Sequence, residues 1–230
     1  MREQRNNVSS SKLVRWGGAL AAMLGGVLGI LLAPLATSAY YYEAEAGSWE
    51  EVPPVWAPPL RSILDPLLTF APPADVYTIY GSGFFLVFLL FLVGLMCLRA
   101  NAGDRIGRSG RWGFILTFVG LTMNLVGNVT DYWLGEKVLG QALWGGSFAV
   151  FTLLGTLVLI TGLVILGLAA LRAEVLPRWS AWPLIILPPL GILLTFWGIK
   201  HTPSGTTLPL SITWILLGYV LWSKSDVPLE

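Results

Sequence analysis

The sequence predicts an all-α protein, a polytopic transmembrane helix bundle with six spans. Three observations predict this class: 55% of the 230 residues are hydrophobic, only 12% are charged, and the mean hydropathy is +0.70. A soluble domain usually carries about twice that share of charged residues. The apolar residues form long continuous runs, whereas strands of a membrane barrel alternate apolar and polar positions. Helices satisfy their own backbone hydrogen bonds, which a hydrocarbon environment requires.

Six stretches are apolar enough to cross a bilayer, which takes about 20 helical residues. We place them at residues 16–39, 79–98, 112–134, 143–171, 182–199 and 208–222. The last begins beside Pro209, which the first turn of a helix tolerates because it needs no amide donor there. Tryptophan and tyrosine residues at the span ends, Tyr40 and Tyr132 among them, are typical interfacial anchors. The chain thus divides into a polar cytoplasmic tail, an anchoring span, an extracytoplasmic loop and a five-span bundle, at residues 1–15, 16–39, 40–76 and 77–230.

The basic residues indicate the orientation, because cytoplasmic loops of membrane proteins are enriched in Lys and Arg. With the N-terminus inside, eleven basic residues fall on the cytoplasmic side and three outside. The acidic residues have the opposite distribution, with eight outside and five inside. We therefore expect both termini in the cytoplasm. The first span ends in small residues typical of a signal-peptide cleavage site, but its apolar run exceeds the usual length of about 7–15 residues, so we interpret it as an anchor.

The loop at 40–76 is acidic and rich in proline, and it carries one helical pattern. Apolar residues recur at helical spacing from Leu60 to Leu68, with Arg61 and Asp65 four positions apart on the other face. This pattern is typical of a short amphipathic helix that lies in the outer membrane interface. A lid over an external site is the alternative, and we favour a connector along the surface.

Two pairs of segments in the chain resemble each other. Residues 94–100 and 167–173 are identical at five of seven positions, and residues 113–120 and 191–198 at five of eight. Both matches occur in the same order along the chain. We therefore predict a duplicated helical hairpin, in which spans 2–3 and 4–5 are related by an axis along the membrane normal.

The third span carries a continuous face of small and polar residues. Its members follow one another at alternating steps of four and three positions, which places them on one side of a helix: Gly113, Thr117, Gly120, Asn124, Gly127 and Asp131. Such a face does not turn to lipid, so it faces the bundle interior or a wet cavity. We interpret its four small residues as a helix-packing seam: Gly113, Thr117, Gly120 and Gly127.

The outer half of this face is the candidate site. The internal repeat places the end of the fifth span opposite it, so we predict an outward-opening polar pocket formed by Asn124, Asn128, Asp131, Lys200 and His201. A neighbouring carboxylate raises the pKa of a histidine and burial lowers it, and the sequence leaves both directions open. The alternative, which we favour, is that the asparagines only bridge helices and the charged groups end their spans in water.

The composition excludes several classes of site. The single His201 and the single Cys97 rule out a haem held by two histidines, a multi-histidine metal centre and an intramolecular disulfide. We expect no metal and no cofactor, and no enzyme signature of the Gly-x-Ser-x-Gly or His-Glu-x-x-His kind is present. The net charge of +1 gives no reason to expect nucleic acid. The bilayer is the expected partner, with anionic lipid as an additional candidate at Arg99, Arg105, Arg108 and Arg111.

One segment resembles a known kind of protein. The run Leu-Arg-Ala-Glu-Val-Leu-Pro-Arg-Trp at 171–179, with residues 188–191 and 218–219, resembles motifs in uncharacterised six-span bacterial integral membrane proteins. The resemblance covers spans 4 to 6 and implies a protein of the bacterial cytoplasmic membrane, without implying an activity or site residues. We therefore expect a non-catalytic accessory or structural multi-pass protein. The alternative is a small-solute or ion transporter with its polar site on the third span, and an intramembrane enzyme ranks behind both.

Overall fold

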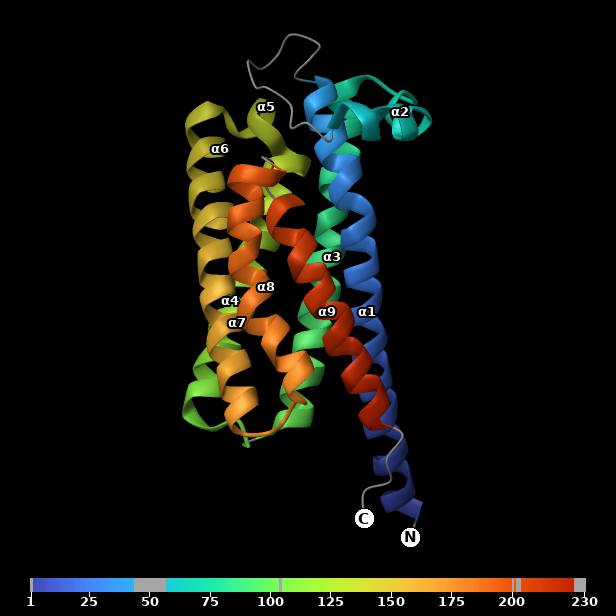
Figure 1. Ribbon diagram of the computed structural model, residues 1–230, viewed down its shortest axis with the longest axis vertical. Helices are drawn as coiled ribbons and strands as arrows, with labels where there is room; N and C mark the ends of the chain where they lie inside the picture. Colours follow the sequence, from blue (N-terminus) through green and yellow to red (C-terminus); the bar gives the residue numbers. More distant parts are fainter. Residues whose placement is uncertain (1, 44–56, 104, 200, 202–203, 226–230) are drawn as a thin grey trace.

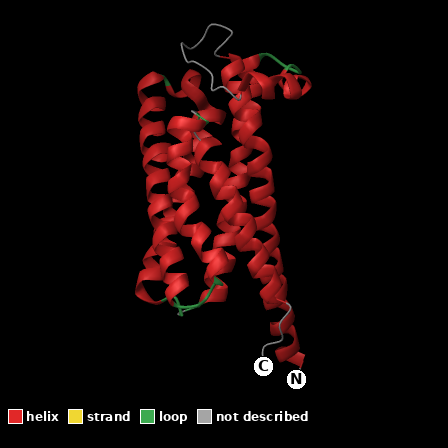
Figure 2. Cartoon of the chain, in the orientation of Figure 1, coloured by secondary structure: helices red, strands yellow, loops and turns green. Residues whose placement is uncertain are grey.

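The computed structural model describes residues 2–43, 57–103, 105–199, 201 and 204–225. Every regular element in these ranges is helical, which confirms the predicted all-α class (Figure 2). In chain order the elements are α1 (Arg2–Glu43), α2 (Ala57–Leu68), α3 (Pro73–Ala102), α4 (Gly107–Asn128), η2 (Val129–Leu134), α5 (Gly135–Leu139), α6 (Gln141–Ser147), η3 (Phe148–Leu154), α7 (Gly155–Arg172), α8 (Arg178–Leu193), η4 (Leu194–Gly198) and α9 (Ser204–Ser225). The η segments are π-helical, which means that their backbone hydrogen bonds join residues five positions apart and not four as in an α-helix.

Six helical stretches among the described residues are long and apolar enough to cross a membrane, as the sequence predicts. They comprise Arg15–Tyr42, Pro73–Ala102, Gly107–Leu139, Gln141–Arg172, Arg178–Trp197 and Ser204–Ser223. The third, fourth and fifth stretches each combine α-helical and π-helical segments. Helix α1 begins at Arg2, so the predicted polar tail continues the first helix.

The long helices form a closed ring in which each contacts the next. The order around the ring is α1, α3, α4, α7, α8 and α9, and α9 returns to α1. The start of α1 and the end of α9 lie at the same end of the bundle, which we call the terminal end (Figure 1). The turns from α3 to α4 and from α7 to α8 also lie there, whereas α2 and α5 lie at the opposite end. The pairs α3–α4 and α7–α8 are both adjacent hairpins, and their duplication stays a prediction.

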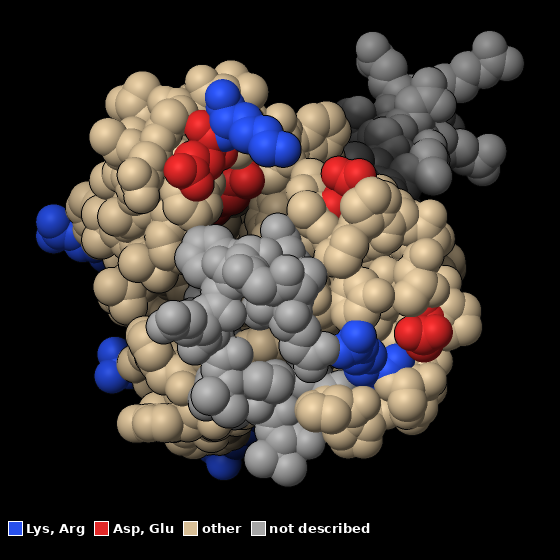
Figure 3. All heavy atoms as spheres, turned by 90° about the horizontal axis from the view of Figure 1, so that it is seen from above, with Lys and Arg blue, Asp and Glu red and all other residues tan. Residues whose placement is uncertain are grey.

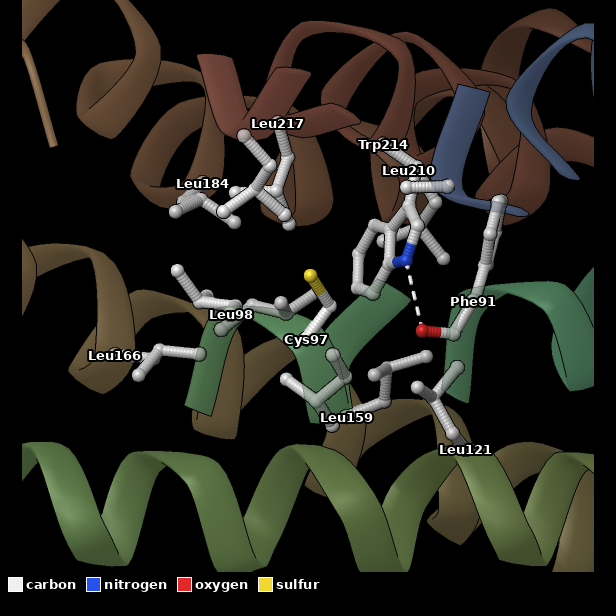
Figure 4. Packing of buried hydrophobic residues seen from close by; sticks show 14 of the residues in the cluster. Phe91, Cys97, Leu98, Leu121, Leu159, Leu166, Leu184, Leu210, Trp214 and Leu217 are labelled. Carbon is white, nitrogen blue, oxygen red and sulfur yellow. Dashed lines mark hydrogen bonds between the residues drawn. The ribbon is translucent and has the colours of Figure 1, made fainter. Parts of the chain in front are cut away.

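Helix α9 supplies the centre of the hydrophobic core. Trp214 is fully buried, and its ring stacks on Phe91 of α3 with 4.6 Å between the ring centroids. The indole Nε1 donates a 3.0 Å hydrogen bond to the Phe91 carbonyl, so the one polar atom of this side chain is satisfied (Figure 4). Cys97 and Leu121 lie beside this pair and join α3 and α4 to the same core.

Pro209 lies deeper in its helix than the sequence predicts. Because α9 begins at Ser204, Pro209 is the sixth helical residue and not part of the first turn. The turn that precedes it is polar but buried, since Ser204 and Thr207 are fully inaccessible. Thr213 donates a 3.0 Å hydrogen bond to the Pro209 carbonyl one turn later. Hydropathy missed this turn because its polar residues are buried against protein and not against lipid.

Helix α2 has the amphipathic character predicted for the 40–76 loop. It lies across one end of the bundle and contacts α1 (Figure 1). Leu68 is buried against Ala39 and Val76, and the Tyr80 hydroxyl donates a 2.6 Å bond to the Leu67 carbonyl. Ile63, by contrast, is 74% exposed on the other side. One apolar side therefore packs on protein, and a second is left for a membrane interface.

Helices α4 and α7 approach so closely that only glycine fits at several positions. A Cβ atom on Gly113 would lie 2.6 Å from the Leu166 amide nitrogen, and one on Gly120 would lie still closer to the Leu159 backbone. A Cβ on Gly127 would meet the hydroxyl of Thr152, and Thr117 is fully buried between the helices. The small residues of the third span therefore form the contact surface with α7. Close backbone approach of this kind is how helices associate without a hydrophobic driving force.

Replacing Gly120 by alanine tests this contact. The new methyl group meets backbone atoms of Leu159, which can move only if α4 and α7 separate. We expect the free energy of unfolding to fall by about 1–3 kcal/mol, measured by denaturant or thermal unfolding of the purified protein in detergent. The matched control is Gly145→Ala, since a Cβ on this helical glycine meets no atom within 4 Å. Equal losses in both variants would contradict the packing argument.

Candidate functional site

Polar side chains gather inside the bundle near the end opposite the termini, in two adjoining groups. We call the first the cavity group: Asn124, Asn128, Asp131, Tyr132 and Thr152. We call the second the histidine group: Thr37, Tyr40, Tyr77, His201 and Ser204. The first group lies on α4, η2 and η3. The second brings together α1, α3, His201 in the connection from α8 to α9, and Ser204 at the start of α9.

Asn124 connects α4 to α7, and both polar atoms of its side chain have a hydrogen-bond partner. Its side chain is 4% exposed. The amide nitrogen donates to the Gly120 carbonyl at 2.8 Å, and the amide oxygen accepts a bond from the Thr156 hydroxyl at 3.1 Å. This geometry supports the bridging interpretation of the asparagine.

Asn128 bridges to another helix but keeps one atom without a partner. The side chain is 3% exposed, and its amide nitrogen donates to the Gly81 carbonyl of α3 at 2.8 Å. Its oxygen Oδ1 is shielded from solvent and has no hydrogen-bond partner among the described residues. Such an unsatisfied buried acceptor is costly, at about 1–3 kcal/mol.

Asp131 shows the same half-satisfied pattern. Its Oδ2 accepts a 2.9 Å hydrogen bond from the Thr152 hydroxyl of η3, whereas its shielded Oδ1 has no partner in the described part of the chain. Asp131 and Asn128 both line a cavity of about 10 Å³, which Phe88 and Phe148 also line. That volume holds about one water molecule.

Two π-helical segments meet at this cavity. Asp131 and Tyr132 belong to η2, and Phe148 and Thr152 belong to η3. A π-helical turn widens the helix and shifts the side chains that follow, and such turns are frequent at functional sites. The backbone irregularity of both helices therefore coincides with the two unpartnered oxygens.

His201 is the centre of the second group and is 4% exposed. Its Nδ1 lies 2.8 Å from the Ser204 hydroxyl and 3.5 Å from that of Thr37, which itself donates to the Ala33 carbonyl. Its Nε2 lies 3.3 Å from the Tyr77 hydroxyl. Burial lowers the pKa of His201 from 6.5 to about 3, so the imidazole is neutral near pH 7.

A pair of tyrosines links the two groups. The hydroxyls of Tyr77 and Tyr132 lie 3.1 Å apart, and Tyr132 also lines the cavity. Asp131 and His201 make no hydrogen bond or ion pair with each other among the described residues, so the predicted pocket resolves into two adjoining parts. Lys200, the remaining member of the predicted pocket, lies outside the described residues.

Sequence patterns did not identify the tyrosines and hydroxyls of this site. Tyr40 and Tyr132 are typical interfacial anchors by their position at span ends, yet Tyr40 lies 4.9 Å from the His201 ring, centroid to centroid. Thr37 belongs to the small-residue end of the first span, which resembles a signal-peptide cleavage site, and Ser204 lies before the predicted sixth span. These residues belong to different helices, so no periodicity within one helix relates them.

The terminal end carries the basic loop. Arg99 donates to the Gly103 carbonyl at the end of α3, and Arg105, Arg108 and Arg111 are exposed. An open hollow of about 600 Å³ lies at the turn from α7 to α8, lined in part by Arg172, Glu174, Arg178 and Trp182.

The side chains of the site offer oxygen ligands and no accessible nucleophile. Ser204 lies within hydrogen-bond distance of a neutral imidazole, but it is fully buried, so a substrate has no access to its hydroxyl. Within the described ranges, no three His, Cys, Asp or Glu side chains come together. The cavity of about 10 Å³ that the cavity group lines therefore suits a ligand of the size of a water molecule or a single ion.

The comparisons with known proteins add no assignment. No protein-family model, no curated protein and no solved structure matches the chain. The resemblance of the 171–179 segment thus remains an expectation from the sequence, and the function is argued from the geometry.

The burial of His201 has a consequence for stability that can be measured. The unfolded chain binds a proton at this residue below about pH 6.5, whereas the folded protein excludes it until about pH 3. The free energy of unfolding should therefore fall as the pH is lowered through this window, by up to about 1.4 kcal/mol per pH unit. Thermal unfolding of the wild type and of His201→Gln across this range is the measurement. The variant should depend less steeply on pH, and an equally steep dependence would contradict the assignment.

Proposed function

We propose that this chain is a multi-pass protein of the bacterial cytoplasmic membrane with a non-catalytic accessory or structural role. The observation that carries the proposal is the close packing of the polar face of α4 against α7. Polar groups along this face are used for helix contacts, as the pairs Asn124–Thr156 and Asp131–Thr152 illustrate. The cavity at its end has room for about one water molecule.

The proposed orientation places the terminal end in the cytoplasm. The two turns at this end and the helix ends beside them carry six arginines: Arg99, Arg105, Arg108, Arg111, Arg172 and Arg178. The view onto the opposite end shows acidic groups in several separate places together with basic ones (Figure 3). The concentration of arginines at the terminal end supports the positive-inside orientation. The exposed arginines of the terminal end are also where we place contacts with anionic lipid.

Transport of an ion or small solute is the second candidate function. It is favoured by the two unpartnered oxygens of Asn128 and Asp131, because intramembrane carboxylates commonly mark ion pathways. The adjoining segments η2 and η3 are places where the helices depart from regular geometry, as the discontinuous helices of transporters do.

Asp131→Ala separates the two functions. The variant leaves the Thr152 hydroxyl without its acceptor, so we expect the free energy of unfolding to fall by about 1–3 kcal/mol. For the structural role, ion flux through proteoliposomes stays at the level of protein-free vesicles for both wild type and variant. The control is Asp75→Ala, an exposed acidic residue in the first turn of α3. Wild-type flux that is lost in the variant at normal abundance would overturn the structural role and support transport.

Cysteine labelling tests the orientation. In a Cys97→Ala background, Ser62→Cys on α2 and Ser109→Cys in α4 place single exposed thiols at opposite ends of the bundle. A membrane-impermeant maleimide should modify the cysteine at 62 in intact cells and the one at 109 only after permeabilisation. The reverse pattern would show that the termini lie outside the cell.

A further inference from the structure

The cavity group presents electronegative atoms to a very small volume. The amide nitrogen of Asn128 is committed to the Gly81 carbonyl, which fixes its oxygen as the remaining polar atom. The amide nitrogen of Asn124 is likewise committed, to Gly120. The hydroxyl proton of Thr152 goes to Asp131 Oδ2, so this residue contributes lone pairs to its surroundings. Each of the two amide nitrogens thus has one N–H bonded to a backbone carbonyl, and two acceptor oxygens of the group stay unpartnered.

The two unpartnered oxygens require a partner with positive charge or a donated proton. Both atoms are shielded from solvent, and Asn128 is 97% buried. Inside a bilayer, water does not compensate unsatisfied polar groups, which therefore cost more than at a protein surface. Residues of both π-helical segments line the cavity, so the irregular backbone of the two helices lies beside the unpartnered oxygens.

The charge and size of the group select the class of ligand. Carboxylate, amide and hydroxyl oxygens are ligands of hard cations. One carboxylate balances one positive charge, and Mg²⁺ would retain several waters, for which a cavity of about 10 Å³ has no room. In membrane transporters, irregular helical backbone beside such side chains coordinates Na⁺.

We propose that Asn128 Oδ1 and Asp131 Oδ1 hold one monovalent cation of the size of Na⁺ in this cavity, between α3, α4 and η3. Thr152 orients the carboxylate by its bond to Oδ2, and Gly81 orients the amide. A protein can bind an ion without transporting it, so this site is compatible with a structural role. The test of ion binding is therefore separate from the test of the proposed function.

The first experiment uses the wild-type protein in detergent. Its unfolding temperature is measured in NaCl, KCl and choline chloride at equal ionic strength, and binding of ²²Na⁺ is measured by equilibrium methods. We expect an unfolding temperature several degrees higher in NaCl than in choline chloride, and close to one Na⁺ bound per chain. Ligand that binds only the folded state raises the unfolding temperature in this concentration-dependent way. No difference between the salts, together with no bound ²²Na⁺, would overturn the proposal and leave a water or a proton as the partner of the two oxygens.

Variants then locate the ion. Asp131→Asn keeps the shape of the side chain but removes its charge, and it should lower Na⁺ affinity at least tenfold and abolish the salt-specific shift. Asn128→Ala should weaken binding through loss of one ligand oxygen. Asp75→Asn, at the exposed start of α3, should bind as the wild type does. Binding that persists in both cavity variants would place the ion elsewhere and overturn the assignment.

Discussion

The structure depends on one constraint, which is that polar groups inside hydrocarbon must find their partners within the protein. Within helices, the backbone groups hydrogen-bond to each other. The hydroxyls of Thr117, Thr195 and Thr213 each donate to the carbonyl four residues earlier in the same helix. The indole of Trp214 donates to the Phe91 carbonyl of α3. Five buried side-chain oxygens of the described residues lack a partner: the hydroxyls of Ser38, Thr207 and Ser211, and Oδ1 of Asn128 and of Asp131. Only the last two belong to residues that line the same cavity.

The glycines of α4 determine which polar groups face each other. By allowing the α7 backbone to approach, Gly113 and Gly120 bring two donor–acceptor pairs into register along the same interface. Asn124 meets Thr156, and two turns further on Asp131 meets Thr152. The packing seam and the candidate site are therefore parts of one interface. The glycines of the seam set the distance between α4 and α7, and at this distance the polar residues form hydrogen bonds across the interface.

Because His201 is buried and neutral, it does not form a charged pair with Asp131, the other ionisable residue discussed at this site. His201 is neutral near pH 7 and is held by hydroxyl groups, so it adds no positive charge near Asp131. The tyrosine pair connects the two groups through hydrogen bonds without joining their charges. A partly buried carboxylate that forms no ion pair with a basic side chain of the described residues is the kind of site that a small cation neutralises.

The sequence by itself determined the all-α class, the six spans, the amphipathic α2 and the side of α4 that faces protein, because hydropathy and periodicity encode depth and direction within a single helix. It also grouped Asn124, Asn128 and Asp131, which share one helix face. Only the tertiary structure decided that Tyr77 and Tyr132 lie between Asp131 and His201, and that the start of α9 is buried. These contacts join residues from helices far apart in the chain, and the packing of the whole bundle sets their distances.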